Sequence, residues 1–265
     1  MFLPSSEILS GQPVNYSHLL NRGLQTWLMA GYHFGGHGSP YWRDISGMHN
    51  HGTLTNMSPA SDWHGSRGRQ GGQGSLSFDG VNDEVRLSRT LSLSGDFTLS
   101  AWSYRNNTAA LHGLFGDSAS STYIVRWANS ATQLTIRTAT DVVRNFTISN
   151  SANVWGNVVV TRLDGSIRAY FNGVESSTGA IADAGLMSIN RIGMSHTASW
   201  FSGALDDVRI HDRAWSHQEV KAYSDLSRQG YPGLLNRLRR PMFAEAAAGS
   251  STFPFFFNRY VLSRA

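Results

Sequence analysis

The sequence predicts an all-β fold, and two observations carry this prediction. Between Ser75 and Ile210, apolar and polar residues alternate with a period of two in short runs, which is the pattern of half-buried strands. Gly, Asn and Asp separate these runs, and no alternating strand–helix–strand pattern interrupts them. We therefore predict antiparallel strands joined by tight turns and stacked as a sandwich of two sheets.

The alternation also predicts which side chains face the core. Asp164-Gly165 and Asn172-Gly173 mark two hairpin turns, because glycine accepts the positive φ that such turns require. An earlier strand is predicted at 24–29. The predicted inward residues, in chain order, are Leu76, Phe78, Val85, Leu87, Phe97, Leu99, Ala101, Tyr123, Val125, Trp127, Leu134, Ile136, Phe146, Ile148, Val158, Val160, Ile167, Ala169, Phe171, Ile189, Ile192, Leu205, Val208 and Ile210.

One or two short helices are predicted after the last strand. Ser216 and Glu219 have the spacing of a capping box, with Val220 and Tyr223 on one face of the helix that follows. A second short helix is predicted at 233–239, ahead of Pro241. The chain thus divides into an N-terminal extended arm (1–22), a sandwich (23–223) and a basic, aromatic C-terminal arm (224–265).

Composition excludes some chemistry and places the charge. The chain has no cysteine, so it has no disulfide framework and no thiol chemistry. Its start lacks the pattern of a signal peptide, and no run is long and apolar enough for a membrane span, so we expect synthesis in the cytoplasm and no membrane partner. The net charge of +4 resides in the C-terminal arm, where six arginines and one acid, Glu245, follow residue 227.

Four sequence patterns, in this order and spacing, resemble the laminin-G-like group of concanavalin A-like jelly rolls. They are Arg43–Gly47 with Asn50–Leu54, then Phe78-Asp79-Gly80, then Asp206–Ile210, and finally Asp212-Arg213-Ala214 leading into the capped helix. The resemblance runs from about Gly23 to Tyr223. It implies a jelly-roll β-sandwich and a binding or structural module.

The resemblance also implies a calcium site. Relatives of this fold hold calcium with an Asp of the last strand and main-chain carbonyls near the Phe-Asp-Gly turn, which implies Asp206 and Gly80 as ligands, with Asp79 and Asp207 beside them. The alternative is that Asp79 and Asp206 accept hydrogen bonds at turns and strand ends. We therefore expect either no cofactor or calcium. A zinc site is not predicted, since His33 and His37 lie in a glycine-rich loop and have no cysteine to join them.

The residue pattern argues against catalysis. Glycosidases of this fold place paired carboxylates on one strand, and here no Glu has a second carboxylate at i+2 or i+4. We therefore predict a non-enzymatic protein. Several aromatic residues, Tyr104 among them, offer a platform for sugars. Trp102 and Trp155 are assigned to the core, and Trp63 and Trp200, in predicted loops, are the predicted glycan-binding residues.

The C-terminal arm is the predicted assembly anchor, because it is too apolar to remain free in water. It either folds back on the sandwich or inserts into another subunit, with its arginines pairing with acidic groups there. The anchor residues are Arg237, Arg239, Arg240, Phe253, Phe255, Phe256, Phe257 and Tyr260.

Together these features favour a virion structural protein of decoration or fibre type. We expect it to be homo-oligomeric and made in the host cytoplasm, with outer loops that touch host glycans. The alternative is a free, extracellular, lectin-type carbohydrate-binding module. A glycoside hydrolase and a nucleic-acid-binding role are disfavoured.

Overall fold

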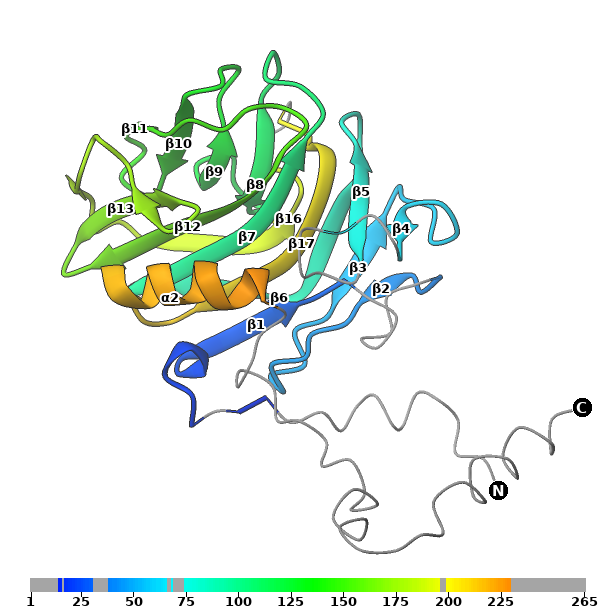
Figure 1. Ribbon diagram of the computed structural model, residues 1–265, viewed down its shortest axis with the longest axis horizontal. Coiled ribbons are helices and arrows are strands. Elements are labelled where there is room, and N and C mark those ends of the chain that lie inside the picture. Colours follow the sequence, from blue (N-terminus) through cyan, green and yellow to red (C-terminus); the bar gives the residue numbers. More distant parts are fainter. Residues whose placement is uncertain are drawn as a thin grey trace, which may run out of the picture. The chain divides into compact units, whose positions relative to one another are not determined.

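Two antiparallel sheets stack as a β-sandwich in the computed structural model of the chain (Figure 1). The structure describes residues 14–15, 17–30, 38–65, 68, 74–195 and 199–229. All of them belong to a compact unit, Met1–Leu235. The second predicted helix and all residues of the predicted assembly anchor lie outside the described residues.

One sheet has nine strands among the described residues. Its main order is β14 (Val174–Glu175), β13 (Ser166–Phe171), β12 (Trp155–Leu163), β7 (Phe97–Arg105), β17 (Ser202–His211), β5 (Ser75–Asp79) and β4 (Trp63–His64). In addition, β1 (Leu24–Leu28) pairs with β17, and β15 (Ile181–Ala182) pairs with β13.

The other sheet has eight described strands. Their order is β11 (Arg144–Thr147), β10 (Gln133–Arg137), β9 (Ile124–Trp127), β8 (His112–Gly116), β16 (Met187–Ile192), β6 (Glu84–Leu93), β3 (Gly52–Thr55) and β2 (Tyr41–Trp42). Strands β8 to β11 are consecutive neighbours, but β16 lies between β8 and β6, and β6 lies next to β3, so strands distant in the chain are brought side by side. The predicted fold class, a concanavalin A-like jelly roll, is confirmed.

The core between the sheets follows the period-two pattern. The predicted inward residues are buried in one cluster, except that Tyr123 and Phe171 are partly buried against it. The two predicted hairpin turns are confirmed by their backbone, since φ is positive at Asp164 (49°), Gly165 (70°), Asn172 (52°) and Gly173 (82°), as type I′ turns require.

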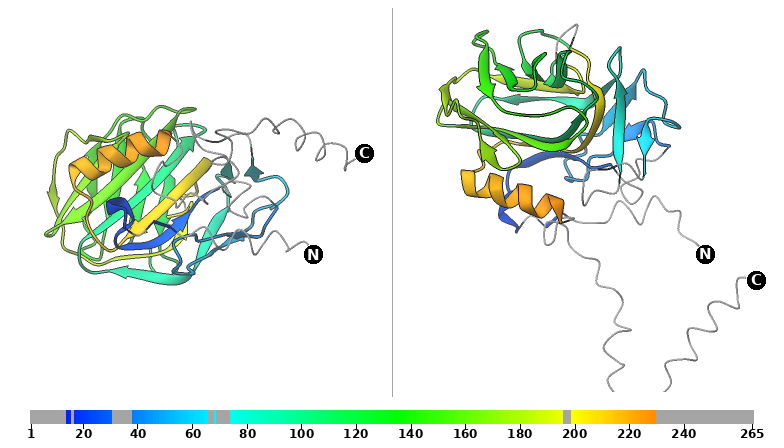
Figure 2. Two further views of the ribbon diagram at one scale, coloured as in Figure 1. Left: turned by 60° about the horizontal axis from the view of Figure 1, so that its bottom comes forward. Right: turned by 45° about the horizontal axis from the view of Figure 1, so that its top comes forward.

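A second apolar cluster lies on the outer face of the nine-stranded sheet, under helix α2 (His217–Arg228; Figure 2). The capping box of Ser216 and Glu219 is present as predicted. The helix continues five residues past Tyr223, the predicted end of the sandwich. A short 3-10 helix, η1 (Leu19–Asn21), leads into β1 and adds Leu20 to the same cluster. Within the described residues, no helix has the length and apolar character to cross a membrane.

Candidate functional site

One half of the outer face of the nine-stranded sheet is covered by α2; we call it the covered half. Val220 and Tyr223 of α2 pack there with Val159, Tyr170 and Trp27 of the sheet, and all five side chains are buried. Trp215, just before the helix, contacts Tyr223 at 4.8 Å between ring centroids.

A buried charged pair holds the helix to this half. Asp207 accepts hydrogen bonds from Trp27 Nε1 (2.7 Å) and the Tyr223 hydroxyl, and it forms an ion pair with Arg209 (2.9 Å). The Arg209 guanidinium stacks on the Trp27 ring at 3.6 Å. A bulge in β17 between Asp206 and Arg209, with Asp207 at a φ of 49°, turns the Asp207 carboxylate toward the helix. Burial and Asp207 raise the pKa of the Tyr223 phenol, so the hydroxyl remains a donor.

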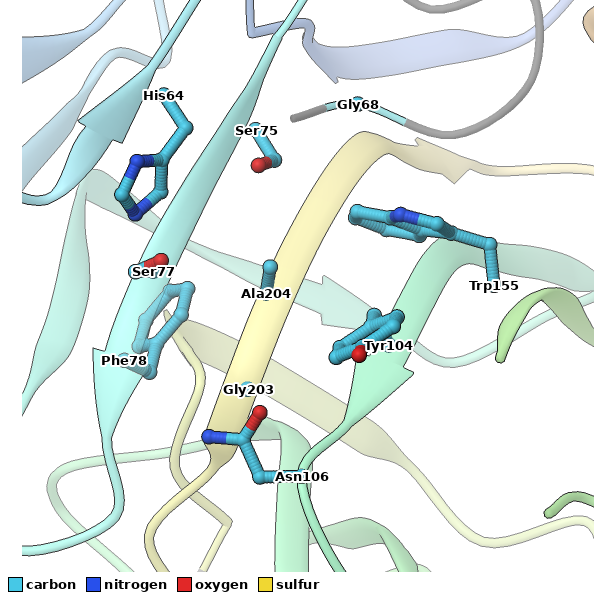
Figure 3. A pocket seen from close by; sticks show the side chains of 10 residues that line it. All are labelled: His64, Gly68, Ser75, Ser77, Phe78, Tyr104, Asn106, Trp155, Gly203 and Ala204. Carbon is cyan, nitrogen blue, oxygen red and sulfur yellow. The ribbon is translucent and has the colours of Figure 1, made fainter. Parts of the chain in front are cut away.

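The other half of this face, which no described helix or strand covers, contains a groove of about 470 Å³ (Figure 3). Strands β4, β5, β17, β7 and β12 contribute to it. Its described lining consists of aromatic, small and polar residues: His64, Gly68, Ser75, Ser77, Phe78, Tyr104, Asn106, Trp155, Gly203 and Ala204. We call this half, with the groove, the groove half.

Two half-buried aromatic rings form one wall of the groove. Tyr104 and Trp155 are direct partners in the register of β7 and β12, so both side chains stand on the same face. Their ring centroids are 5.7 Å apart with planes tilted by 50°. The Tyr104 hydroxyl lies 3.3 Å from Asn153 Oδ1. Figure 3 shows the two rings on the same side of Ala204, across it from His64 and Ser77.

Trp102 shows why this pair stays open. It precedes Tyr104 by two residues on β7 and therefore shares its face, but its side chain is buried. Its Nε1 donates to Ser227 Oγ (3.2 Å) at the end of α2, and Arg228 lies over the ring. The helix ends there, so nothing among the described residues covers the next outward ring along the strand.

Small residues make the floor of the groove. Gly203 has no room for a side chain, because a Cβ would lie 1.9 Å from the Tyr104 carbonyl oxygen, and its φ is 143°. Ala204 follows and presents only a methyl group between Ser77 and Tyr104, its partners on the neighbouring strands. A ligand can therefore approach the sheet backbone closely.

The described lining contains no Asp, Glu, Lys or Arg side chain. Arg105 lies between Tyr104 and Asn106 in sequence, but it points to the inner side of the sheet, where it is fully buried. There it donates to the carbonyls of Ser130 (3.2 Å) and Asn150, and its guanidinium stacks on Trp127. Burial lowers the pKa of Arg105 to about 10.

The acidic residues singled out from the resemblance serve the fold's own donors. Asp206 is fully buried, and its Oδ1 accepts from the main-chain N–H groups of Ala30 (2.9 Å) and Asp207 (2.7 Å). Asp79 Oδ1 accepts from the N–H groups of Val81 and Asn82. These bonds are the ones that the hydrogen-bonding alternative describes.

The same residues are also spread along the sheet. Gly80 sits in the turn after β5 at a φ of 81°, close against Ser202. Asp79 is the register partner of Ser202, four residues before Asp206 on β17, which places their backbones roughly 13 Å apart. Within the described residues, no group of three His, Asp or Glu side chains is placed to hold a metal ion.

The two predicted glycan-binding tryptophans lie away from the groove lining. Trp63 was expected to be exposed, but it is only 4% exposed: its Nε1 donates to the Ser39 carbonyl (2.8 Å), and its ring packs edge-on against Trp42. Trp200 is half-buried and forms a bridge with Met194. Trp155, predicted to lie in the core, lines the groove instead, because nothing among the described residues covers it.

The sequence contains one signal that indicates the groove. Tyr104 and Trp155 fall on outward positions of neighbouring strands, and the outward positions of the next two strands, Ala204 and Ser77, are small. Recognising this requires the strand order, which the alternation of residues does not provide.

Comparisons with known proteins agree with the fold. Residues 78–221, more than half of the chain, match the family model described as the concanavalin A-like lectin/glucanases superfamily (Laminin_G_3). The chain belongs to this superfamily, which confirms the family resemblance seen in the sequence. A search of curated proteins gives no match.

Several solved structures share the fold at low identity. The binding domain of Paraclostridial Mosquitocidal Protein 1 has a TM-score of 0.54 and 15% identity, over 80% of this chain and 56% of that one. Domain 4 of AbnA, a GH43 extracellular arabinanase from Geobacillus stearothermophilus, in complex with arabinotriose, has a TM-score of 0.55 and 14% identity, over 76% of this chain and 98% of that one.

The receptor-binding domain of botulinum neurotoxin mosaic serotype C/D gives a TM-score of 0.54 and 12% identity, over 78% of this chain and 51% of that one. The chain thus spans about half the length of the mosquitocidal and neurotoxin domains. At these identities the similarity establishes the fold alone: a lectin/glucanase-like β-sandwich.

Proposed function

We propose that this protein binds a glycan, without catalysing a reaction on it, in the groove on the outer face of its nine-stranded sheet. The observation that carries the proposal is the half-exposed pair Tyr104–Trp155 beside a small, polar floor. Flat aromatic faces stack on the apolar faces of sugar rings, while hydroxyl, amide and imidazole groups bond to sugar hydroxyls. Domain 4 of AbnA, of similar fold, was solved with arabinotriose, which makes this sugar a suitable first probe.

Binding rather than hydrolysis fits the composition of the groove. Glycoside hydrolysis requires two carboxyl groups on either side of the scissile bond. The described lining of the groove has no Asp or Glu, so it offers neither a general acid nor a nucleophile of this type.

The test is calorimetric titration of the full chain with arabinotriose and a panel of other oligosaccharides, next to two variants. Trp155→Ala removes a stacking ring and should weaken binding by at least about tenfold. Tyr41→Ala, which removes a 52%-exposed ring on β2 of the other sheet, should leave binding unchanged. Equal glycan affinities of the wild type and Trp155→Ala would contradict binding in this groove.

We also propose that the sandwich is displayed by an assembly, as a virion structural protein of decoration or fibre type. The support is the sequence of the C-terminal arm, which carries arginines and then Phe253–Phe257 beyond the last described helix. Such an arm would anchor the subunit to sister copies while the groove faces outward. The alternative is a free lectin-type module.

The mass of the full chain in solution, compared with a version ending at Gln229, separates these two roles. Gln229 is the C-cap of α2, so the truncation keeps the described fold complete. An assembled full chain and a monomeric truncation would support the anchor. Two monomers would favour the free module.

A further inference from the structure

Resting on the proposed function, we infer that the groove takes an uncharged, linear oligosaccharide lying across the strands, with one sugar ring against Tyr104 and Trp155 and further units toward His64. Three features of the groove lead to this ligand class: the absence of Asp, Glu, Lys and Arg from its described lining, its length across the sheet, and the different chemistry of its two ends.

The first feature is that charged residues next to the groove in sequence point away from it or are bonded to the main chain. Arg105, next to Tyr104, is turned to the inner side and bonded to carbonyls. Asp79, next to Phe78, is engaged by the N–H groups of its own turn. A glycan with carboxylate or sulfate groups would find no cation in the described lining. It would lose hydration without a compensating ion pair, so acidic sugars are disfavoured.

The second feature is the direction and length of the groove. Its lining comes from five adjacent strands in the order β12, β7, β17, β5 and β4. Four strand spacings of about 4.8 Å each separate the first from the last, roughly 19 Å in all. This is longer than one sugar ring. Because Gly203 and Ala204 keep the middle of the floor low, a chain can cross from end to end.

The third feature is the contrast between the two ends (Figure 3). The end on β7 and β12 carries the rings of Tyr104 and Trp155, which suit the apolar face of a sugar. The end on β4 and β5 carries Ser77 and His64, which suit sugar hydroxyls. Trp155 should therefore contribute to the binding of every length of ligand, and His64 only to ligands long enough to reach it.

The experiment measures the affinity of the full chain for a neutral monosaccharide, disaccharide, trisaccharide and longer members of the same series. An acidic oligosaccharide of matched length is the charge control. We expect affinity to rise with length and the neutral series to bind more tightly than the acidic one. Trp155→Ala should weaken all lengths, whereas His64→Ala should weaken only the longer ones, by roughly fivefold.

Two further variants make the result decisive. Ser77→Ala removes a small hydroxyl from the same end of the groove, and it should also weaken only the longer ligands. It serves as the test if His64→Ala does not fold. His217→Ala, an exposed histidine on α2, should change nothing.

The possible results distinguish failure of this inference from failure of the proposed function. Equal affinity for monosaccharide and trisaccharide, tighter binding of the acidic series, or no effect of His64→Ala and Ser77→Ala on long ligands would overturn the inference while leaving glycan binding in place. If no tested saccharide binds in a way that Trp155→Ala weakens, the proposed function itself is overturned.

Discussion

The covered half and the groove half of the nine-stranded sheet present similar residues to very different environments. On β7, Trp102 and Tyr104 stand two positions apart on one face, yet α2 buries the first and leaves the second open. In the covered half, aromatic rings and the pair Asp207–Arg209 join a helix to the sheet. In the groove half, rings and small polar groups remain available. The comparison shows that an outward aromatic residue becomes core or binding surface according to where the last helix ends.

The largest expected effect comes from breaking the covered half at Asp207. Asp207→Ala removes the carboxylate from the buried Arg209 and an acceptor from both Trp27 and Tyr223. We expect the free energy of unfolding to fall by about 3–5 kcal/mol, as measured by urea denaturation. Asp225→Ala, at an exposed i,i+4 pair on α2, is the control and should cost no more than about 0.5 kcal/mol. Similar losses for the two variants would show that Asp207 does not hold the helix.

A second effect is on the pH dependence of stability. Burial lowers the pKa of His211, in the covered half, to about 3, and burial together with Arg105 lowers that of His112 to about 4. As pH falls below about 6.5, the unfolded chain binds protons at these imidazoles and the folded chain does not. Stability should then fall, by up to about 1.4 kcal/mol per pH unit for each imidazole.

Asp83 acts in the opposite direction. Burial raises its pKa to about 6, so between about pH 6 and 4 the folded chain binds a proton there more readily than the unfolded chain, which offsets one imidazole. Urea denaturation at several pH values measures the net slope. His211→Asn should flatten it and Asp83→Asn should steepen it. An unchanged slope in His211→Asn would contradict the assignment to that imidazole.

A smaller effect is expected at the start of α2. Ser216→Ala removes the hydroxyl that caps the Glu219 N–H, which should lower stability by about 1 kcal/mol. Ser177→Ala, at an exposed serine between strands, is the matched control. Because the groove lies on the other half of the face, glycan affinity should be the same in both variants. A large loss of affinity in Ser216→Ala would mean that the two halves are coupled.

A similarly small change in stability is expected in the groove half. Trp155 is half-buried, so Trp155→Ala should cost less stability than Asp207→Ala, about 1 kcal/mol, while it weakens glycan binding. Thermal unfolding and calorimetry on the same sample test both parts. A loss of several kcal/mol would show that Trp155 belongs to the core, as its sequence pattern first suggested.

Local patterns predicted much of the fold correctly. The inward residues, the turns at Asp164-Gly165 and Asn172-Gly173, and the cap at Ser216 each depend on neighbours in sequence, through side-chain alternation, positive φ and a hydrogen bond over three residues. The environment of other residues comes from distant segments, which local patterns do not reveal, and the expected exposure of Trp63 was wrong for this reason. Trp63 is buried by Trp42 and by the Ser39 carbonyl, and Asp207 points to α2 only because β17 bulges there.

By itself, the sequence determined that this protein is an all-β sandwich with a capped helix after its last strand, because periodicity and turn chemistry act over a few residues. Its motifs also carry the resemblance to the concanavalin A-like superfamily. Only the tertiary structure decided that Tyr104, Trp155, Ser77 and Ala204 share one groove. Some of them, such as Ser77 and Ala204, are more than a hundred residues apart in the chain. The strand order and the end of α2 determine which outward side chains meet and which are covered.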